Sequence, residues 1–218
     1  CDPWLDGYCF EEGWGLKYDN PSAWEKIKDC NYLWLSHFHT DHYHTSTLRK
    51  ILQINPKIIP LANFSYNFKF TKILSSMGFT DIIPFNERRK LYICKDLWLI
   101  RFPTTGIDNM LFIQSKEGSI LNYNDCNIPV SARKILKKYM GNIDILLNNF
   151  NHAGKLMDYP QRKNDEIKTE MISNFINTVK SFNPKYTIPF ASFHYYRAPE
   201  SMIQNNSLMN ISELISID

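Results

Sequence analysis

The chain has 218 residues, 44% of them hydrophobic and 22% charged, which is typical of a globular protein of about one domain. Its apolar runs fall far short of the roughly 18 residues that a membrane-spanning helix needs, so we expect no membrane span. Lys and Arg number 25 against 22 Asp and Glu, and this small excess does not indicate a nucleic-acid-binding surface. We therefore expect no nucleic-acid partner.

The five cysteines include no Cys-x-x-Cys pair, which disfavours both a disulfide framework and a thiolate zinc site. A reducing compartment fits this pattern, and we expect a cytoplasmic protein. The chain begins at Cys1 with neither an initiator Met nor a signal peptide, so we expect a segment to precede it. A mature lipoprotein would also begin with cysteine, and that alternative stays open.

No linker, repeat or low-complexity block divides the chain, so residues 1–218 are expected to form a single domain. Ser22 and Glu25, after Pro21, match a capping box and predict a short helix over Trp24–Lys28. The apolar segment Tyr32–Ser36 predicts a buried strand, which a histidine-rich loop follows. The next predicted elements are a helix over Thr45–Gln53, a strand over Lys57–Leu61 and a helix over Tyr66–Met77 that ends at Gly78.

Short β-rich segments separated by turn residues occupy the middle of the chain and predict an antiparallel meander. These segments are Asp81–Phe85, Lys90–Cys94, Leu97–Phe102, Met110–Gln114 and Ser119–Asn122. The elements predicted after them are a helix over Pro129–Tyr139, a buried strand over Ile143–Leu147, a long amphipathic helix over Asp165–Phe182 and a last strand over Tyr186–Pro189 before a polar tail. This order predicts an α/β fold with mixed sheets covered by helices.

Four of the six histidines lie within the segment His37–His44, directly after the predicted buried strand. In an extended chain, residues two apart point to the same side, so His37 and His39 can present two imidazole nitrogens to one cation. Asp41 and His42 then lie on the turn into the next helix, where they could hold a second cation. Mixed imidazole and carboxylate ligands suit zinc, iron or manganese. A purely structural role would leave several polar rings unpartnered if they were buried, so we expect a metal site.

The His-x-His-x-Asp-His pattern of residues 37–42, after an apolar strand, resembles the signature of the metallo-β-lactamase fold superfamily. The segments Cys1–Leu5, Gly13–Trp14, Asn122–Asn127 and Pro189–Phe193 resemble one branch of it, which contains the metallo-β-lactamase-like domain of CMP-N-acetylneuraminate hydroxylase. This resemblance covers almost the whole chain. It implies a four-layer αββα sandwich, in which helices flank two mixed β-sheets. It also implies a chain truncated at its N-terminus, because relatives usually have a β-hairpin before the segment that matches Asp2–Leu5.

The resemblance also implies two adjacent metal ions. The residues that match the superfamily's ligands are His37 and His39 at the first ion, Asp41 and His42 at the second, Asp125 bridging both, and His194 at a strand end. A shared carboxylate is chemically sensible, because ions roughly 3.5–4 Å apart repel each other. Considered without the resemblance, Asp125 could be a turn or capping residue, and His194 a half-buried structural histidine.

One departure from the superfamily concerns the first metal. A further histidine is expected for it before the bridging aspartate, but no His occurs from residue 45 to residue 151. Asp108 or a threonine hydroxyl in the segment Phe102–Asp108 could replace that ligand, or the first site could be weak or empty. His152 could complete the site or contact substrate, although a plain loop role fits it equally well.

The site predicts a metal-dependent hydrolase, in which a metal-bound water attacks a phosphoester or other ester of a sugar- or nucleotide-like molecule. Asp41 would orient this water and accept its proton. The expected cofactors are one or two divalent ions, zinc first, with iron or manganese as alternatives, and the expected partner is a small molecule such as a phosphorylated sugar or a nucleotide-sugar. The candidate substrate contacts are His44, His152, Tyr195 and Arg197.

Two other functions stay open. A non-hydrolytic module that binds a nucleotide-sugar or glycan precursor, with a degenerate metal site, would account for the absent histidine. A di-iron redox protein is the third possibility, because His and Asp also bind iron. The chain contains no Cys-x-His pair, so we expect no Rieske cluster within it.

Overall fold

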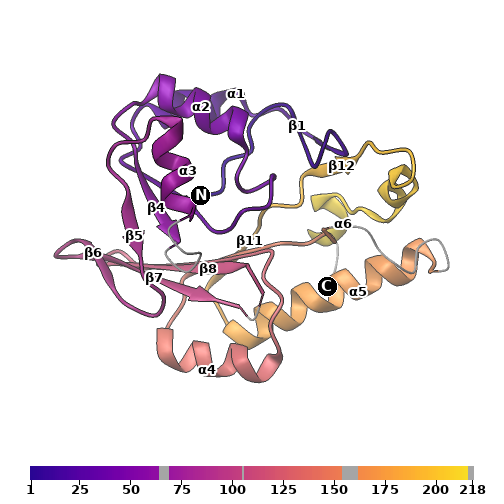
Figure 1. Ribbon diagram of the computed structural model, residues 1–218. Helices are drawn as coiled ribbons and strands as arrows, with labels where there is room; N and C mark the ends of the chain where they lie inside the picture. Colours follow the sequence, from indigo (N-terminus) through magenta and orange to yellow (C-terminus); the bar gives the residue numbers. More distant parts are fainter. Residues whose placement is uncertain (64–68, 105, 154–161, 216–218) are drawn as a thin grey trace.

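The computed structural model describes residues 1–63, 69–104, 106–153 and 162–215 (Figure 1). In chain order the elements are β1 (Tyr8–Cys9), β2 (Trp14–Leu16), α1 (Pro21–Ile27), β3 (Tyr32–Leu35), α2 (Thr45–Ile54), β4 (Ile59–Asn63), α3 (Lys69–Met77), β5 (Ile83–Phe85), β6 (Leu91–Cys94), β7 (Leu97–Pro103), β8 (Asn109–Ser115), β9 (Ser119–Asn124), α4 (Val130–Met140), β10 (Ile145–Asn148), α5 (Asn164–Phe182), β11 (Tyr186–Pro189), β12 (His194–Tyr196), η1 (Met202–Ser207) and α6 (Ile211–Ile215). None of these helices is both long and apolar enough to cross a bilayer.

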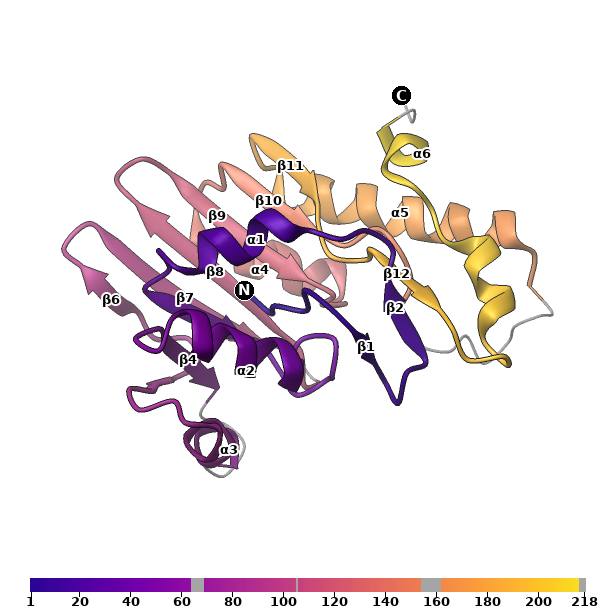
Figure 2. The same cartoon turned by 90° about the horizontal axis from the view of Figure 1, so that it is seen from above.

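The strands form three sheets (Figure 2). The largest has the order β11-β10-β9-β8-β7-β6; β9, β10 and β11 run parallel, while β6 to β9 form an antiparallel meander. The second sheet, β3-β4-β5, is parallel, and the third, β1-β2-β12, is antiparallel. We expected two mixed sheets; in the described part of the chain, only the six-stranded sheet mixes strand directions.

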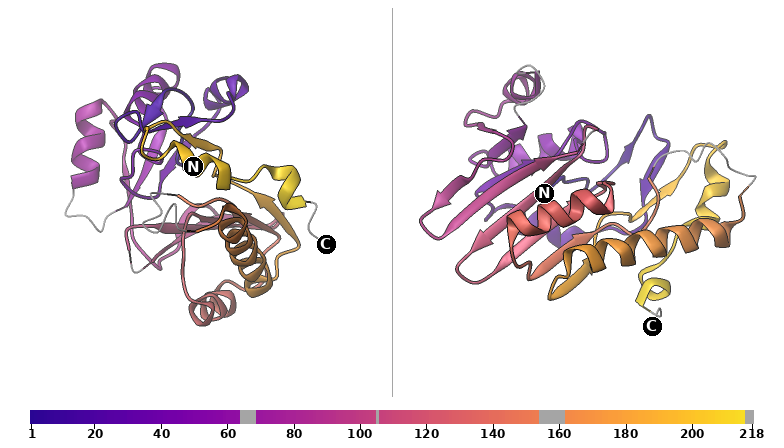
Figure 3. Two further views of the ribbon diagram at one scale, coloured as in Figure 1. Left: turned by 90° about the vertical axis from the view of Figure 1, so that its right-hand side faces the viewer. Right: turned by 90° about the horizontal axis from the view of Figure 1, so that it is seen from below.

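The six-stranded sheet packs against the β3-β4-β5 sheet, and helices cover the outer side of each. Apolar side chains from both sheets fill the space between them: Trp34, Leu61, Phe85, Leu99 and Leu111. Burying each of these contributes roughly 1.5–3 kcal/mol. Helices α2 and α3 cover the β3-β4-β5 sheet, and α4 and α5 cover the far face of the six-stranded sheet (Figures 1 and 3). The protein is therefore an α/β protein with flanking helices, as the order of its elements predicts.

Helix α2 fixes the end of the histidine-rich loop. Its first turn is capped by His44, whose Nδ1 accepts a hydrogen bond from the Thr47 backbone N–H. The buried residues Leu48 and Ile51 lie one helical turn apart and anchor the helix in the core beneath it. The loop before α2 is thus held between a buried strand and a packed helix.

Two predictions for individual elements were wrong. Helix α1 begins at Pro21, not at Trp24, and its N-cap is Asn20 with no side-chain cap bond, so Ser22 does not form the expected capping box. Proline fits the first helical position because its missing N–H is not needed there. The strand Ile83–Phe85 does not start the meander; it pairs parallel with β4 in the other sheet. Its apolar pattern could not specify a partner strand.

The C-terminal part of the chain was also predicted incorrectly, as a polar tail after β11. It contains the strand β12, the 3₁₀ helix η1 and the helix α6. Leu208, Met209 and Leu214 are buried there against the rest of the molecule. The other predicted elements are present with small differences at their ends, and the predicted first turn of α3 lies outside the described residues.

Candidate metal centre

The loop after β3 brings its own polar side chains together. The backbone N–H groups of His42 and Tyr43 both donate to the carbonyl oxygen of His39, at 3.0 and 2.7 Å, and close a tight turn. This turn carries Asp41 and His42 back toward His37. The spacing in the sequence therefore places the predicted ligands on one concave surface.

The first ligand group combines two histidines with an aspartate. His37 Nε2 lies 2.9 Å from His39 Nδ1 and 3.7 Å from Asp108 Oδ1. The three donor atoms all lie within 4.8 Å of one another, a spacing that one metal ion can bridge. Asp108 is held by the β7–β8 loop, where the Thr104 N–H donates to its carbonyl oxygen at 3.0 Å. Asp108 could thus supply a third ligand atom beside His37 and His39.

The second group of three donor atoms within 4.8 Å of one another comprises His37, His42 and Asp125, and Asp41 also lies beside His42. His42 Nε2 lies 3.3 Å from Asp41 Oδ2 and 3.3 Å from Asp125 Oδ2. The same Asp125 oxygen lies 4.0 Å from His37 Nε2, so it reaches the first group as well. Asp125 follows β9, whose last residue, Asn124, has a positive φ of 58° that turns the chain at the strand end. Asp125 therefore lies close enough to both groups for its carboxylate to contribute a ligand atom to either.

Several buried polar atoms at this centre have no hydrogen-bond partner in the described structure. They are Oδ1 of Asp41, Oδ1 of Asp125 and Nε2 of His194. Leaving such atoms unsatisfied is costly, and buried polar groups nearly always have partners. All three are atoms of types that bind metal ions, so a divalent cation within reach of them would satisfy them. The donor set and its unsatisfied atoms therefore fit metal binding.

His194 lies beside the second group and not within either group of three. Its ring stacks on Trp14, with centroids 4.2 Å apart and planes inclined by 12°. With Asp41 and His42 it lines a second, more apolar cavity of about 620 Å³. Ala191 and Ser192, shortly before it, both have positive φ and form the bend that leads from β11 to β12. The structure thus places His194 near the second ligand group without showing it as a ligand.

The protonation of the isolated groups favours metal binding. Burial and the nearby charge of His42 lower the pKa of His37 to about 4, and burial lowers the pKa of His194 to about 4. Both rings are therefore neutral near pH 7, the form that binds metal ions. Burial and the charge of Asp125 raise the pKa of Asp108 to about 6. Its carboxylate is still mostly ionised at neutral pH.

The pKa of His42 shifts in the opposite direction to those of His37 and His194, because three carboxylates surround its ring. Burial acts to lower its pKa, but hydrogen bonds with Asp125, Asp2 and Asp41 raise the pKa well above the usual value. Without an ion, the proton on His42 offsets part of the negative charge at the centre. A cation bound to His42 Nε2 would replace that proton.

Three residues outside the ligand set orient the histidine rings. Asp2 Oδ2 lies 3.4 Å from His42 Nδ1, and Asp2 Oδ1 accepts a 2.6 Å hydrogen bond from the Ser36 N–H. Asn124 Nδ2 donates to Asp2 Oδ2 and to Ser36 Oγ, both at 3.1 Å, and Ser36 Oγ lies 2.9 Å from His37 Nδ1. Such contacts fix ring orientation and strengthen metal binding. This role was not predicted from the sequence; the signal for it was Asp2 in the segment Cys1–Leu5.

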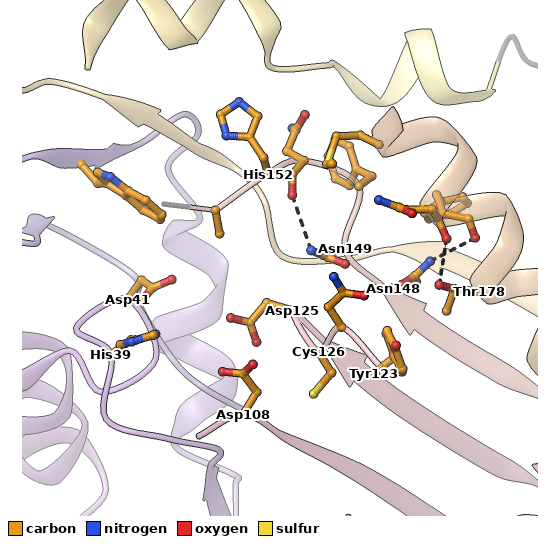
Figure 4. A pocket seen from close by; sticks show the side chains of 18 of the residues that line it. His39, Asp41, Asp108, Tyr123, Asp125, Cys126, Asn148, Asn149, His152 and Thr178 are labelled. Atoms are coloured by element: carbon orange, nitrogen blue, oxygen red, sulfur yellow. Dashed lines mark hydrogen bonds between the residues drawn. The ribbon is translucent and has the colours of Figure 1, made fainter. Parts of the chain in front are cut away.

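The ligand groups line one end of a cavity of about 650 Å³. His39, Asp41, Asp108 and Asp125 face this space together (Figure 4). Its other residues include five asparagines and several larger side chains: Asn127, Asn148, Asn149, Asn151, Asn174, Tyr123, Arg133, Phe150, His152, Met171, Phe175 and Thr178. Small-molecule sites typically occupy roughly 300–1,000 Å³, so the cavity can hold a small substrate against the centre.

The four predicted substrate contacts lie at different places. His152 lines the cavity, but its ring nitrogens lie 2.9 Å from the Tyr196 hydroxyl and 3.0 Å from Ser207 Oγ. His44 is not among the residues lining the cavity; besides capping α2, its Nε2 lies 3.0 Å from the Tyr8 carbonyl oxygen. Its contacts therefore give it a structural role.

Tyr195 and Arg197 are also absent from the cavity lining. Tyr195 packs over the backbone of Gly15, where an added Cβ would lie 2.6 Å from the ring. The guanidinium carbon of Arg197 lies 3.5 Å from the centre of the Tyr8 ring, and its Nη1 donates to the Glu12 carbonyl oxygen. The structure therefore brings together the predicted loop ligands and Asp125, adds Asp108, and leaves these two residues apart.

Among solved structures, CmlA, a diiron β-hydroxylase from Streptomyces venezuelae, aligns with a TM-score of 0.58 and 18% identity, over 86% of this chain and 40% of CmlA. The metallo-β-lactamase fold protein YhfI from Bacillus subtilis aligns with a TM-score of 0.52 and 12% identity, over 83% of this chain and 71% of YhfI. The protein has the metallo-β-lactamase fold.

The sequence is distantly related to the cytidine monophosphate-N-acetylneuraminic acid hydroxylases. It is 26% identical to the Xenopus laevis protein over 233 aligned residues, which cover 96% of this chain and 37% of that protein. The Sus scrofa protein is 25% identical over 228 residues, with 96% and 51% covered. This chain thus spans about half or less of the length of these relatives. No family model matches it.

Proposed function

We propose that this chain is a metal-dependent enzyme that binds two iron ions and performs oxidative chemistry on a small molecule. The position of Asp108 carries the proposal. With His37 and His39 it forms a set of two imidazoles and one carboxylate, which is typical of non-haem iron oxygenases. A carboxylate in place of a third histidine adds negative charge, which stabilises Fe³⁺ more than Fe²⁺ and makes oxidation easier.

Each ion would have its own ligands. His37, His39 and Asp108 would hold the first, Asp41 and His42 the second, with Asp125 shared and His194 as a further candidate at the second ion. Bound iron would supply one-electron chemistry and oxygen activation. The names of the sequence relatives and of CmlA, all hydroxylases, support this choice. Residues 1–218 contain no Cys-x-His pair for a Rieske cluster, so electrons would reach the iron from a donor outside this segment.

A second candidate is the metal-dependent hydrolase that the sequence predicts, with zinc in place of iron. The observation that favours it is Asp41, whose Oδ1 is buried without a partner and which lines the cavity. A carboxylate in this position can orient a metal-bound water and accept its proton. The substrate would then be a phosphoester or other ester. The non-hydrolytic binding module loses its main support, because Asp108 could supply a third ligand atom beside His37 and His39.

The deciding experiment is elemental analysis and visible spectroscopy of protein purified without chelators or nickel resin. Two iron ions per chain with visible absorption support the proposal. Zinc or manganese, with hydrolysis of bis(p-nitrophenyl) phosphate, would replace it with the hydrolase. One ion or none would favour the binding module.

Variants test the ligand assignment directly. His39→Ala should lose metal while retaining its circular dichroism spectrum, and Asp108→Asn should lose metal from the first site. Asp29→Asn is the matched control, since Asp29 is exposed at the end of α1. Full metal content in Asp108→Asn would remove the observation on which the choice of iron depends.

A further inference from the structure

Helix α4 places an arginine inside the cavity that contains the ligand groups. Arg133 is only 5% exposed and lines this cavity together with Asp108 and Asp125. Its guanidinium carbon lies 5.8 Å from the centre of the Tyr123 ring. Nε and Nη1 are buried and have no hydrogen-bond partner among the residues that the structure describes. The guanidinium also interacts with the Tyr123 hydroxyl, but this buried cationic side chain beside the cavity keeps two unused donors.

No carboxylate among the described residues neutralises this charge. In the described parts of the chain, no Asp or Glu oxygen lies within 4.0 Å of an Arg133 nitrogen. The cavity carboxylates Asp108 and Asp125 instead lie within 4.0 Å of the imidazole nitrogens of His37 and His42. Arginine stays charged in proteins, so it cannot avoid the cost of burial by losing its proton. A buried unpaired charge is strongly unfavourable, and an anion from outside would remove that cost.

We infer that Arg133 binds an anionic group of the substrate, and that the substrate is a hydroxylated small molecule that carries a carboxylate or a phosphate. The planar guanidinium matches both groups, because each can accept two parallel N–H bonds. The inference rests on the proposed function in one respect, since it takes this cavity as the place where substrate meets the metal ions.

The asparagines of the cavity indicate what the rest of the substrate offers. Asn148 Nδ2 donates to the Phe175 carbonyl oxygen and Asn149 Nδ2 to the Asn151 carbonyl oxygen, at 3.5 and 3.4 Å. Each carboxamide oxygen is left free to accept a hydrogen bond from a ligand (Figure 4). Acceptors of this kind suit hydroxyl or amide N–H groups.

The test compares three ligands of similar shape by isothermal titration calorimetry: glucose, glucuronate and glucose 6-phosphate. Each is titrated into protein as purified and into protein stripped of metal, so that binding through the ions is measured separately. At least one charged ligand should bind the wild type about tenfold or more tightly than glucose, because hydrogen bonds to charged groups are strong. The charged ligand that binds more tightly shows whether Arg133 prefers a carboxylate or a phosphate.

The test variant is Arg133→Met, which keeps the side-chain length and removes the charge. It should lose the preference for the charged ligand in both metal states, whereas Arg133→Lys should retain part of it. Arg89→Met, at an exposed loop position, is the matched control and should bind like the wild type. The metal content of Arg133→Met should be unchanged, so the metal proposal and the anion proposal can fail independently.

Three results would overturn the inference. The first is a wild type that binds neither charged ligand more tightly than glucose, and the second is an Arg133→Met variant that keeps the preference. The third is a large loss of stability in Arg133→Met. A buried charge without a partner contributes nothing favourable to the free protein, so its replacement by an apolar side chain should leave the melting temperature unchanged or raise it.

Discussion

Asp2 contacts the ring nitrogen Nδ1 of the candidate ligand His42, and its carboxylate can be replaced by an amide of almost the same shape. In Asp2→Asn, the amide oxygen can still accept the hydrogen bond from the Ser36 N–H that Asp2 Oδ1 accepts at 2.6 Å. The amide nitrogen then replaces Oδ2, which lies 3.4 Å from His42 Nδ1 and accepts from Asn124 Nδ2 at 3.1 Å. The substitution therefore places an amide N–H donor opposite two other donors, His42 Nδ1 and Asn124 Nδ2. It also removes the negative charge beside His42.

The size of the effect follows from these contacts. Losing one charge-assisted hydrogen bond costs about 1.5–3 kcal/mol, which corresponds to about 10–150-fold in affinity. Residues that support metal-binding histidines typically contribute 10–100-fold, a range that agrees with this estimate. We expect Asp2→Asn to bind its metal about 10–100-fold more weakly, as measured by competition with a fluorescent chelator, whereas Asp29→Asn keeps wild-type affinity. Equal affinities in the two variants would refute the role given to Asp2.

Metal removal should lower the melting temperature by about 5–10 °C, because an ion at 100 times its Kd adds about 2.7 kcal/mol of stability and each kcal/mol shifts a chain of this size by about 2–4 °C. Calorimetry with and without chelator measures this, and identical melting curves would mean that the His/Asp groups bind no ion. Metal affinity should also rise with pH, because binding displaces the proton that three carboxylates hold on His42, at about tenfold per pH unit for one proton. Below about pH 6, where burial keeps Asp108 increasingly protonated, the slope should approach two protons. An affinity independent of pH would contradict the assignment of both residues.

Local patterns in the sequence specify much of this site. The alternation of His37 and His39 after an apolar strand is enough to place two rings on one side, and the turn at Asp41 and His42 follows from their position before a helix. The main sheet was predictable for the same reason, since the meander strands β6 to β9 follow one another along the chain. Contacts between segments that are adjacent in the sequence can be predicted without information about distant parts of the chain.

Local sequence patterns could not predict the contacts between segments that are distant in the sequence. Nothing in Ile83–Phe85 shows that it pairs parallel with β4, because an apolar run fits either sheet. Asp2 and Asn124 are 122 positions apart, and their hydrogen bond exists only once β9 lies beside the N-terminal segment. Arg133 falls within a predicted helix, and nothing in the local sequence shows that its side chain is buried. Contacts between distant segments decide these roles.

The charges around the cavity indicate how the proposed substrate is oriented between Arg133 and the metal ions. Asp41, Asp108 and Asp125 line one end, where metal ions would offset part of their negative charge, and Arg133 lines the same cavity without a carboxylate partner. An anionic substrate gains most when its charged group binds the arginine, since unlike charges attract and the carboxylates repel it. The part of the molecule that meets the ions would then be its uncharged, hydroxylated part. This orientation fits an oxidative reaction at carbon better than hydrolysis of a phosphoester, whose phosphate would have to lie at the ions.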